Sequence, residues 1–456
     1  MKKLNKKEMV QNLAEQYAVN VKVGDVIRAK QETHYRNKVI VAFGKSKGKV
    51  YAGQYAPHSH RVIKDSGRLL QPEIINQIID RITELVQSMK IYLYNDQNGT
   101  GVLRHVMIRQ AHATGEIMVV FVTGTSKFPS RHNLIQVLTS EFPQIKTIVQ
   151  TINSRQTSVV IENKPLVLYG DGTITDILCG KKITISATAF YQIHSEQCEV
   201  LYGLAKKMVN CKPTDTLLDT YCGVGTIGLT LADSCKSVMG VEINSDAIHN
   251  ARHNAKQNHV KNMKFVDMDS TEFMMEAKRY NHHFDVIVLD PPRAGTTKPF
   301  IEAATALNPR KICYISCDPK TLMRDLKGFK KCGYTTNKIE LVDMFPKTEH
   351  IETVAVLSRK SASKSFIPVS ISPKDMGLSE EKDQPTYANI RDYVQKTHGM
   401  KVSSLYVAQM KAECGLETQA DRSGDKKQPK CPPEKREAIL DAFRHFGLMG
   451  EDETEK

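Results

Sequence analysis

The fold of this chain is decided by the stretch Leu217-Leu218-Asp219-Thr220-Tyr221-Cys222-Gly223-Val224-Gly225-Thr226-Ile227-Gly228. Its first part is apolar enough for a buried strand, and its glycines predict a tight turn that opens a helix. Glycine lets the backbone of such a turn approach a ligand closely. An acidic residue, Glu242, ends the next predicted strand about 20 residues on, where the ribose of a nucleotide would lie. The stretch therefore predicts a nucleotide-type cofactor at the start of a strand–helix domain.

The alternation of strands and helices extends from about residue 176 to 360. Five strands are expected, at residues 216–221, 237–243, 263–268, 284–289 and 311–315. Two later strands, 335–344 and 352–358, are close enough in sequence to pair antiparallel. This order predicts an α/β fold with a Rossmann-like, doubly wound parallel sheet.

Four other segments flank this domain. Residues 1–20 hold a short N-terminal helix, and residues 21–175 predict an α+β region with an amphipathic helix at 72–90. Residues 361–384 are rich in Ser, Lys and Pro and predict a linker. Helix-capping residues return in residues 385–450, which predicts a small helical appendage whose spacing fits a helix-turn-helix.

The composition points to an anionic partner. The net charge is +14 over 456 residues, which fits nucleic acid, although a basic but otherwise ordinary enzyme is the alternative. The 10 cysteines include no Cys-x-x-Cys pair, so no zinc or iron–sulfur spacing is visible. The paired histidines His58/His60 and His282/His283 are expected to be solvated loop residues rather than metal ligands. The sequence shows no signal core and no apolar run of membrane length, which predicts reduced thiols in a cytoplasm.

Two cofactors suit the glycine turn. NAD and S-adenosylmethionine both fit the order strand, turn, helix, strand and acid. The turn is short, and its form Asp219-x-x-Cys222-Gly223-x-Gly225 is the methyltransferase variety, since a methyl donor needs no cradle for a pyrophosphate. We expect Asp219 to orient the turn or to bind the amino group of the donor, and Cys222 to pack. Asp269 follows the third strand, where an acid can accept from an adenine amino group or simply lie in a solvated loop.

A candidate reaction site follows the fourth and fifth strands. The loop Asp290-Pro291-Pro292-Arg293 lacks the aromatic residue of amino-group methyltransferases and the cysteine of cytosine-5 enzymes. Cys317 instead follows the fifth strand, where Asp318 can cap a helix and Pro319 suits its first position. Because the positive end of a helix favours a thiolate, Cys317 is a candidate nucleophile. The alternative for a lone cysteine is a buried structural role.

Five motifs stand together in this domain. They are Ala189-Phe190-Tyr191-Gln192, residues 219–225, residues 290–295, Ser316-Cys317-Asp318-Pro319 and residues 343–352. Jointly they resemble the motifs of the bacterial RNA uridine-5 methyltransferases, which make 5-methyluridine in tRNA and 23S rRNA. The upstream motif Tyr35-Arg36-Asn37-Lys38 and residues 150–153 are similar to the family too. The resemblance implies a class I methyltransferase domain at 176–360 and an RNA-recognition domain at 21–175.

The resemblance also implies the chemistry and the residues that carry it. Carbon-5 of uracil is a poor nucleophile, and a thiolate that adds at carbon-6 activates it. Cys317 matches the family's nucleophile, and Glu352, by itself a strand-edge carboxylate, matches the base that removes the carbon-5 proton. The residues that match the cofactor pocket are Gln192, Tyr221, Glu242, Asp269, Asp290 and Thr226, the last at a position where the family often has Asn. Asp290 is also expected to touch the target base, which would have to be flipped out of folded RNA.

Departures from the family set further expectations. Many members begin with a small β-barrel RNA-binding domain, of which residues 1–20 are expected to hold only a part. No cysteine precedes Cys179, so no iron–sulfur cluster is expected. RNA binding is then expected to depend on residues 21–175 and on the appendage, for which dimerisation or stability is the other role considered. The lysines that suggest an RNA contact in the appendage are Lys401, Lys411, Lys426, Lys427 and Lys430.

The sequence thus predicts a monomeric enzyme that methylates carbon-5 of a uridine in 23S rRNA with S-adenosylmethionine. The same chemistry on tRNA is one alternative. Another is a non-catalytic RNA-binding or RNA-folding paralogue, against which the intact set Cys317, Glu352 and Asp290 argues. A cytosine-modifying enzyme is the third, and the cysteine-free loop at residues 290–295 argues against it.

Overall fold

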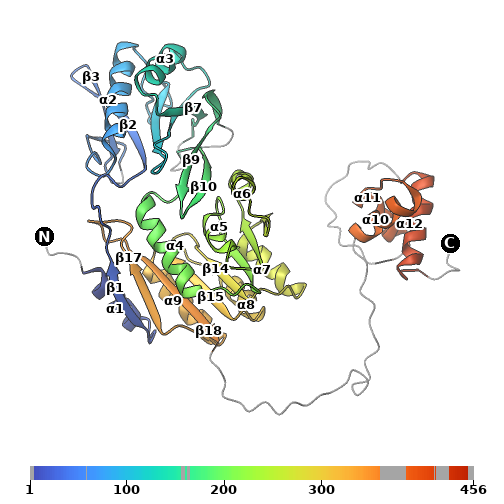
Figure 1. Cartoon of the computed structure of the whole chain (residues 1–456). Coiled ribbons are helices and arrows are strands. Elements are labelled where there is room, and N and C mark those ends of the chain that lie inside the picture. The colour runs from blue at the N-terminus through green and yellow to red at the C-terminus, as the bar shows by residue number, and fades with distance from the viewer. Residues whose placement is uncertain are drawn as a thin grey trace. The chain divides into compact units, whose positions relative to one another are not determined.

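The computed structural model describes residues 5–57, 59–155, 160–161, 165–359, 387–414, 416 and 431–449. The chain divides into two compact units, Met1–Ala362 and Ser363–Lys456 (Figure 1). Among the described residues, no helix is long and apolar enough to cross a membrane.

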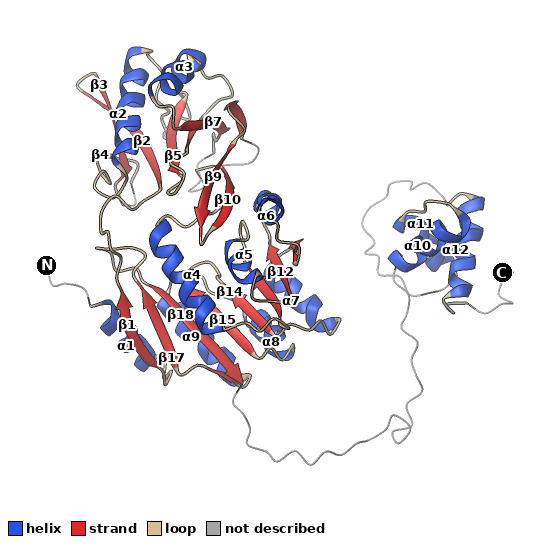
Figure 2. Ribbon diagram, in the orientation of Figure 1, coloured by secondary structure: helices blue, strands red, loops and turns tan. Residues whose placement is uncertain are grey.

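A nine-stranded sheet forms the larger of the two main parts of the first unit, below the upstream region in Figure 2. Its strands are β1 (Lys22–Ile27), β11 (Thr216–Thr220), β12 (Ser237–Glu242), β13 (Met263–Asp267), β14 (Val286–Leu289), β15 (Lys311–Ser316), β16 (Tyr334–Thr335), β17 (Lys338–Val342) and β18 (Glu352–Arg359). Their order is β1-β17-β18-β15-β14-β11-β12-β13, and β16 pairs with β18. Strands β11 to β15 run parallel, whereas β18 is antiparallel to both β15 and β17. The Rossmann-like sheet and the antiparallel pair at its end are therefore confirmed.

Alternate residues of these strands face two separate cores. On β14, Val286 and Val288 belong to one core, and Ile287 and Leu289 belong to the other. The helices of the first core are α4 (Ser195–Val209), α5 (Thr226–Ala232) and α6 (Ser245–Gln257), and those of the second are α1 (Lys6–Gln16), α7 (Ser270–Arg279), α8 (Lys298–Ala306) and α9 (Pro319–Lys331). Because both faces are covered, the central strands are rich in apolar residues without a strict polar alternation.

One strand of this sheet comes from the segment that the sequence assigned to the upstream region. Strand β1 pairs in parallel with β17, with Lys22 opposite Lys338. Helix α1 contacts both β1 and α9. No local pattern marks this pairing, because the partner strand lies near the other end of the domain in sequence. The upstream sheet therefore begins after β1, and not at residue 21.

The upstream region forms a seven-stranded sheet of order β4-β3-β2-β5-β6-β7-β8. Its strands are β2 (Lys38–Ser46), β3 (Lys49–Tyr55), β4 (Val62–Lys64), β5 (Leu103–Gln110), β6 (Ile117–Thr123), β7 (Ile145–Ile152) and β8 (Leu166–Tyr169). Helices α2 (Glu73–Ser88) and α3 (Arg131–Glu141) pack on one face, and α2 buries Ile75, Ile78 and Ile82 there. This is the amphipathic helix expected at residues 72–90.

The other face of the upstream sheet packs on a two-stranded hairpin, β9 (Thr173–Leu178) and β10 (Lys181–Ser186). Met107 and Met118 of the upstream sheet and Ile183 of the hairpin share a core with Leu217 of the larger sheet. The nine-stranded and seven-stranded sheets of the first unit are therefore joined, through the hairpin, by one continuous apolar core.

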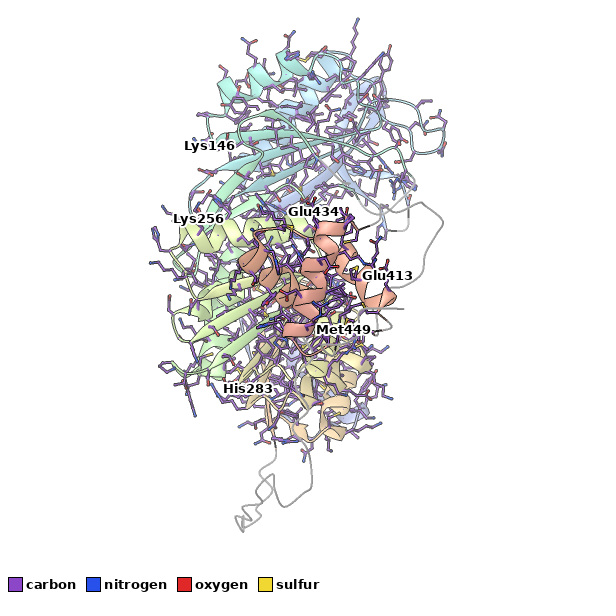
Figure 3. All side chains as sticks on the ribbon, turned by 90° about the vertical axis from the view of Figure 1, so that its right-hand side faces the viewer. Lys146, Lys256, His283, Glu413, Glu434 and Met449 are labelled. Atoms are coloured by element: carbon purple, nitrogen blue, oxygen red, sulfur yellow. The ribbon has the colours of Figure 1, made fainter. Side chains whose placement is uncertain are left out.

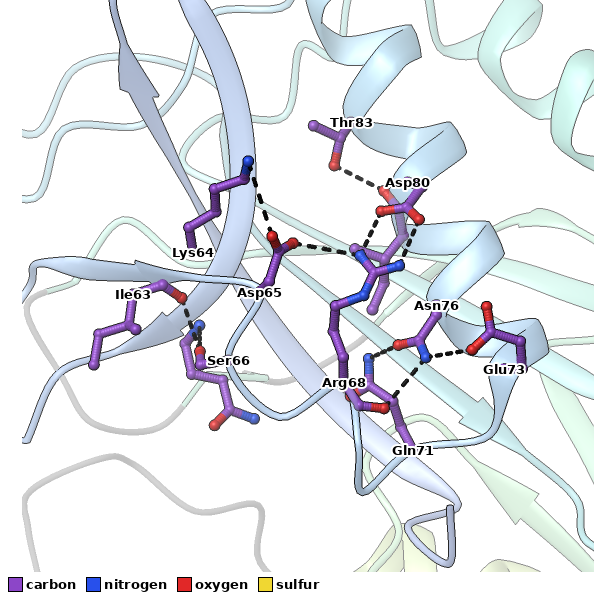
Figure 4. A network of polar contacts seen from close by, with 12 residues as sticks. Ile63, Lys64, Asp65, Ser66, Arg68, Gln71, Glu73, Asn76, Asp80 and Thr83 are labelled. Atoms are coloured by element: carbon purple, nitrogen blue, oxygen red, sulfur yellow. Dashed lines mark hydrogen bonds and ion pairs between the residues drawn. The ribbon is translucent and has the colours of Figure 1, made fainter. Parts of the chain in front are cut away.

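A polar network fixes the connection that leads into α2 (Figure 4). The Arg68 guanidinium donates two hydrogen bonds to Asp80, at 2.7 and 2.6 Å. The Gln71 amide donates to Asn76 Oδ1 at 2.7 Å. Behind this segment, His34 Nδ1 contacts the carbonyl of Gln71 at 2.9 Å. The Arg36 amide also donates to the Leu70 carbonyl at 2.8 Å, which links the segment before α2 to the motif at residues 35–38.

The second unit is a small helical bundle. It contains α10 (Tyr387–His398), α11 (Ser404–Glu413) and α12 (Pro433–His445), with a core of its own built around Ile390, Val407 and Phe443. The helices expected in the appendage are confirmed. Figure 3 shows Glu413 and Glu434 on this unit, and Glu413 forms an ion pair with Arg436.

The expected RNA-contacting lysines of this unit differ from one another. Lys401 is exposed. Lys411 is buried, and its ammonium lies 5.3 Å from the centre of the Tyr387 ring. Lys411 is thus part of the packing and is not available to RNA. Lys426, Lys427 and Lys430 lie outside the described residues.

Candidate active site

Six of the expected site residues lie at the ends of neighbouring strands. The parallel strands end at the same edge of the sheet at which the antiparallel β18 begins, and ligands bind at this edge in open α/β folds. Along the sheet from β13 to β18, the residues at this edge are Asp269, Glu242, Tyr221, Asp290, Cys317 and Glu352. Strands β12 and β13 are added on one side of β11, and β14 and β15 on the other, so the strand order reverses between β11 and β14. Asp290 follows β14 and therefore lies at this switch point, where open α/β sheets form a crevice.

The glycine turn after β11 is held by two carboxylates. Asp219 is completely buried, and its Oδ2 accepts from the Gly228 amide at 2.8 Å. Glu242 Oε2 accepts from the Gly223 amide at 3.1 Å. Tyr221 adopts a φ of 60°, which is rare outside glycine. Because Asp219 is buried beneath the turn, it orients the turn, the first of the two roles expected for it.

A pocket opens beside this turn. It is lined by four expected residues, Gln192, Tyr221, Thr226 and Asp290. Gly223 lies in the lining with a φ of 54°, and a Cβ atom there would meet no atom within 4 Å. The backbone thus leaves a space that a side chain would fill, which fits the close approach of a cofactor. The lining also contains residues that were not among the expected site residues: Leu178, Phe190, Tyr191, Tyr202, Cys222, Val224 and Ile227.

The two remaining cofactor candidates also hold backbone groups at neighbouring strand ends. Glu242 Oε1 accepts from the Asn244 amide at 2.9 Å, and the Glu242 carbonyl accepts from Met268 at 3.0 Å. Asp269 caps α7, since its Oδ1 accepts from the Thr271 and Glu272 amides. Each carboxylate has further lone pairs with which to bind a ligand.

The loop that carries Gln192 is held by Asn37, just before β2 of the upstream sheet. The Asn37 side-chain amide donates to the Gln192 carbonyl at 2.8 Å and to Ser195 Oγ at 3.0 Å. Its backbone amide donates to the Ile193 carbonyl at 2.9 Å. Asn37 is 4 % exposed, so water does not compete well for these bonds. Asn37 lies in a motif that resembles the family, but only the fold shows that it holds the loop of Gln192.

Arg109, on β5, holds the start of the same loop. Its guanidinium donates to the carbonyls of Ser186 and Ala189, both at 3.0 Å. Arg109 is 1 % exposed, and burial lowers its pKa to about 10. No sequence signal distinguishes Arg109 from other strand residues. Together Asn37 and Arg109 connect the upstream sheet to the cofactor pocket.

Cys317 and Glu352 are brought together by the antiparallel pairing of β15 and β18. Ser316 and Thr353 are register partners, so Cys317 and Glu352 are the next residues outward on the two strands. The Thr353 hydroxyl reinforces this pairing by donating to the Ser316 carbonyl at 2.9 Å. Glu352 is buried and Cys317 is partly exposed. A thiol and a carboxylate therefore lie side by side at the crevice.

The charges around Cys317 oppose the thiolate. Burial and then the carboxylates of Glu352 and Asp290 raise the pKa of Cys317 to about 11, while Arg293 lowers it. Asp318 does cap α9 through the Lys320 and Thr321 amides. The helix end predicted a lowered pKa for this thiol, whereas burial and two carboxylates raise it.

The carboxyl groups themselves also titrate unusually. Burial raises the pKa of Asp290, and burial together with Asp290 raises the pKa of Glu352. The Arg293 guanidinium acts in the opposite direction on Glu352. A carboxylate with a raised pKa is a stronger base than an ordinary one, which suits a group that must take a proton from carbon.

The remaining cysteine and histidines that the sequence singled out show no metal site where the structure describes them. Cys222 is buried, as expected for packing. His60 pairs with Asp96 at 3.5 Å and His283 with Asp285 at 3.1 Å, and both histidines are largely exposed. His58 lies outside the described residues. In the part of the chain that the structure describes, no three His, Cys, Asp or Glu side chains are grouped as a metal site would require.

The fold and the crevice define a class I methyltransferase, and the chain's relatives define which kind. The family described as tRNA (Uracil-5-)-methyltransferase matches residues 178–360. RNA methyltransferases of Oceanobacillus iheyensis and Clostridium tetani are each 39 % identical, over 75 % of this chain and 74 % of theirs. The solved tRNA (uracil-54, C5)-methyltransferase of Pyrococcus abyssi, in complex with S-adenosyl-L-homocysteine, is 26 % identical with a TM-score of 0.63, over 77 % of this chain and 82 % of that one.

This chain belongs to the RNA uracil-5 methyltransferase family. It is an RNA uracil-5 methyltransferase that uses S-adenosylmethionine. The residues around the glycine turn suit that cofactor in their chemistry, since Gly223 leaves room at the backbone and polar side chains line the space beside it.

Proposed function

We propose that this enzyme methylates carbon-5 of a specific uridine in 23S rRNA through a covalent bond between Cys317 and the uracil ring. The observation that carries the mechanism is the adjacency of Cys317 and Glu352 at the ends of paired strands. The choice of 23S rRNA rests on the resemblance of the motifs. tRNA is the second candidate, because the matching family and the solved Pyrococcus abyssi protein are both named for tRNA.

In the proposed first step the sulfur of Cys317 adds to carbon-6 of the flipped-out uracil. The carbon-5 to carbon-6 π electrons move toward the carbonyl oxygen at carbon-4, which makes carbon-5 nucleophilic. S-Adenosylmethionine supplies the methyl group that carbon-5 then takes up. The sulfur is released only if carbon-5 loses its proton, since that electron pair re-forms the double bond as the bond from carbon-6 to sulfur breaks.

Glu352 is proposed as the base that takes this carbon-5 proton. Its raised pKa makes its carboxylate a better proton acceptor than an exposed glutamate. Arg293 is proposed to stabilise the Cys317 thiolate, since it is the cation that lowers the pKa of this thiol. Gln192, Tyr221, Thr226, Glu242 and Asp269 are proposed to bind the cofactor, and Asp290 to contact both cofactor and base.

RNA carrying 5-fluorouridine tests this proposal. Fluorine at carbon-5 cannot leave as a proton, so the adduct should accumulate and should survive denaturing electrophoresis. The adduct should disappear in Cys317→Ala, whereas the same substitution at the buried Cys313 should leave it in place. An adduct that persists in Cys317→Ala would overturn the assignment of the nucleophile. Mapping of 5-methyluridine in 23S rRNA and in tRNA then separates the two substrates.

A further inference from the structure

A continuous basic segment lies on the methyltransferase domain, outside the crevice. Residues 247–266 contain no Asp or Glu. Over the same residues the cationic side chains are Arg252, Lys256, Lys261 and Lys264, all of them exposed. Helix α6 supplies the first two, and the other two belong to the turn before β13 and to β13 itself.

These side chains surround a groove on the protein surface. Its polar lining consists of Arg252, Lys256, His259, Lys261 and Lys264, and its apolar lining of Ala255, Val260, Met263 and Phe265. No lining residue is acidic. Arg252 is fixed by a hydrogen bond to the Phe265 carbonyl at 3.3 Å. None of the four cations forms an ion pair with any residue that the structure describes, so their charge is not neutralised within the unit.

Edge protection alone does not explain this charge. Strand β13 is the outer strand of the sheet, and a lysine on an edge strand discourages pairing with other chains. Lys264 could serve that purpose, but Arg252 and Lys256 lie on the helix. Figure 3 labels Lys256 on this helix. A charge distribution that spans helix, turn and strand around one groove suits a polyanion.

The helix that borders the groove also contacts the hairpin β9–β10, which lies between the two larger sheets. The Lys182 carbonyl of β10 accepts from Gln257 at 3.0 Å and from Asn258 at 2.7 Å, both at the end of α6. Lys182 itself is exposed. The end of α6, next to Lys256, therefore contacts the hairpin that packs on the upstream sheet.

We propose that this groove binds the phosphate backbone of the RNA substrate, at a distance from the uridine that reacts. Phosphate contacts of this kind position RNA without reading its sequence, and they supply affinity that falls with salt. The inference depends on RNA being the substrate. It does not depend on which uridine is methylated or on the covalent mechanism.

The test is a charge reversal, Lys256→Glu with Lys261→Glu and Lys264→Glu. Binding of a labelled single-stranded oligouridine is measured by fluorescence anisotropy over a series of NaCl concentrations. Each phosphate contact with a single strand contributes about 0.7 to the magnitude of the slope of log affinity against log salt. The triple variant, which loses three contacts, should therefore have a slope that is smaller in magnitude by about 2. Its affinity at low salt should fall at least about tenfold.

The matched control reverses three exposed lysines of α9, Lys327, Lys330 and Lys331. These lysines carry the same charge but line none of the pockets found near the crevice or the groove. The control should keep the wild-type slope. Equal losses in both triple variants, or no loss in the groove variant, would overturn the proposal, since net charge or another surface would then carry the RNA.

The covalent adduct distinguishes this inference from the proposed mechanism. At saturating RNA carrying 5-fluorouridine, the groove variant should still form the Cys317 adduct to the wild-type extent. If circular dichroism shows that the charge-reversal variant is unfolded, a variant with the same three lysines changed to glutamine is measured in its place. Its slope of log affinity against log salt should be reduced by about the same amount as expected for the charge reversal. If the slope of the glutamine variant equals that of the wild type, the proposal that the groove binds RNA phosphates is wrong.

Discussion

The edge of the large sheet has two halves that are built in different ways. The cofactor half is named for the residues proposed to bind the cofactor, Tyr221, Glu242 and Asp269, and it follows three strands that are consecutive in the chain, β11 to β13. The reaction half is named for the residues proposed to carry the reaction, Asp290, Cys317 and Glu352, and it needs the chain to return through the antiparallel β18. The first half is held by local hydrogen bonds to backbone amides, and the second by pairing between distant strands.

The two halves also differ in electrostatics. The carboxylates of Glu242 and Asp269 are occupied with backbone amides of turns and a helix cap. In the reaction half, burial raises the pKa of Cys317, Glu352 and Asp290, so three acids resist ionisation together. We infer that the cofactor half is built for binding, whereas the reaction half keeps groups ready to exchange protons. Four predictions test this contrast, from the largest expected effect to the smallest.

The largest effect is expected for Glu352→Gln. Turnover should fall by about 10²–10⁴-fold, because the carbon-5 proton is no longer removed. A methylated covalent adduct should accumulate on ordinary RNA, detectable by mass spectrometry. The matched substitution in the other half, Glu242→Gln, should weaken cofactor binding without trapping an adduct. Full turnover by Glu352→Gln would remove this residue as the base.

The second prediction concerns pH. The thiolate is the reactive form, and the pKa of Cys317 is raised to about 11, so the rate of adduct formation should rise about tenfold per unit between about pH 7 and about pH 9. Single-turnover measurements with 5-fluorouridine RNA give this rate. A rate independent of pH over this range would show that the thiol is activated when the ligands bind.

Arg293→Met provides the matched variant for the pH experiment. Because Arg293 lowers the pKa of Cys317, its removal should raise that pKa further and slow adduct formation at any fixed pH in the range. Cofactor affinity, measured by calorimetry, should stay the same. An equal loss of cofactor affinity would contradict a role confined to the reaction half.

A smaller effect is expected where the upstream sheet meets the cofactor half. Asn37→Ala removes two side-chain hydrogen bonds to the loop of Gln192 and should weaken S-adenosylmethionine binding by about tenfold. The rate at saturating cofactor should change much less. The exposed Asn12 offers a control, and Asn12→Ala should bind the cofactor normally. Loss of kcat without a change in KM would assign Asn37 to the reaction half instead.

The smallest effect concerns stability. Burial raises the pKa of Asp219 to about 7, above the value near 3.9 of an unfolded aspartate. The folded state therefore binds the proton more tightly, and its stability should fall as pH rises from about 4 to about 7. Asp219→Asn keeps an acceptor for Gly228 but cannot ionise, so its free energy of unfolding should exceed that of the wild type at pH 8 by on the order of 1–3 kcal/mol. Urea denaturation of both proteins at pH 5 and pH 8 gives the difference between their free energies of unfolding. If this difference is the same at both pH values, ionisation of Asp219 does not affect stability and the prediction is wrong.

The sequence by itself determined the local structure of the cofactor half. Strand, glycine turn and acid are contiguous, and a local pattern records local structure. The helices expected at residues 72–90 and in the appendage followed for the same reason, since amphipathic spacing and caps are read within one segment. The sequence could also single out Cys317 and Glu352, but only through the resemblance of their motifs to a family.

Only the tertiary structure decided what depends on distant partners. It placed β1 beside β17, buried Lys411 against Tyr387, and brought Asn37 and Arg109 to the loop of Gln192. It also showed that burial and two carboxylates raise the pKa of Cys317 despite the helix end beside it. Burial and electrostatic fields sum over every neighbour in space, whereas a sequence pattern records only neighbours along the chain, and this is why these features could not be read from the sequence alone.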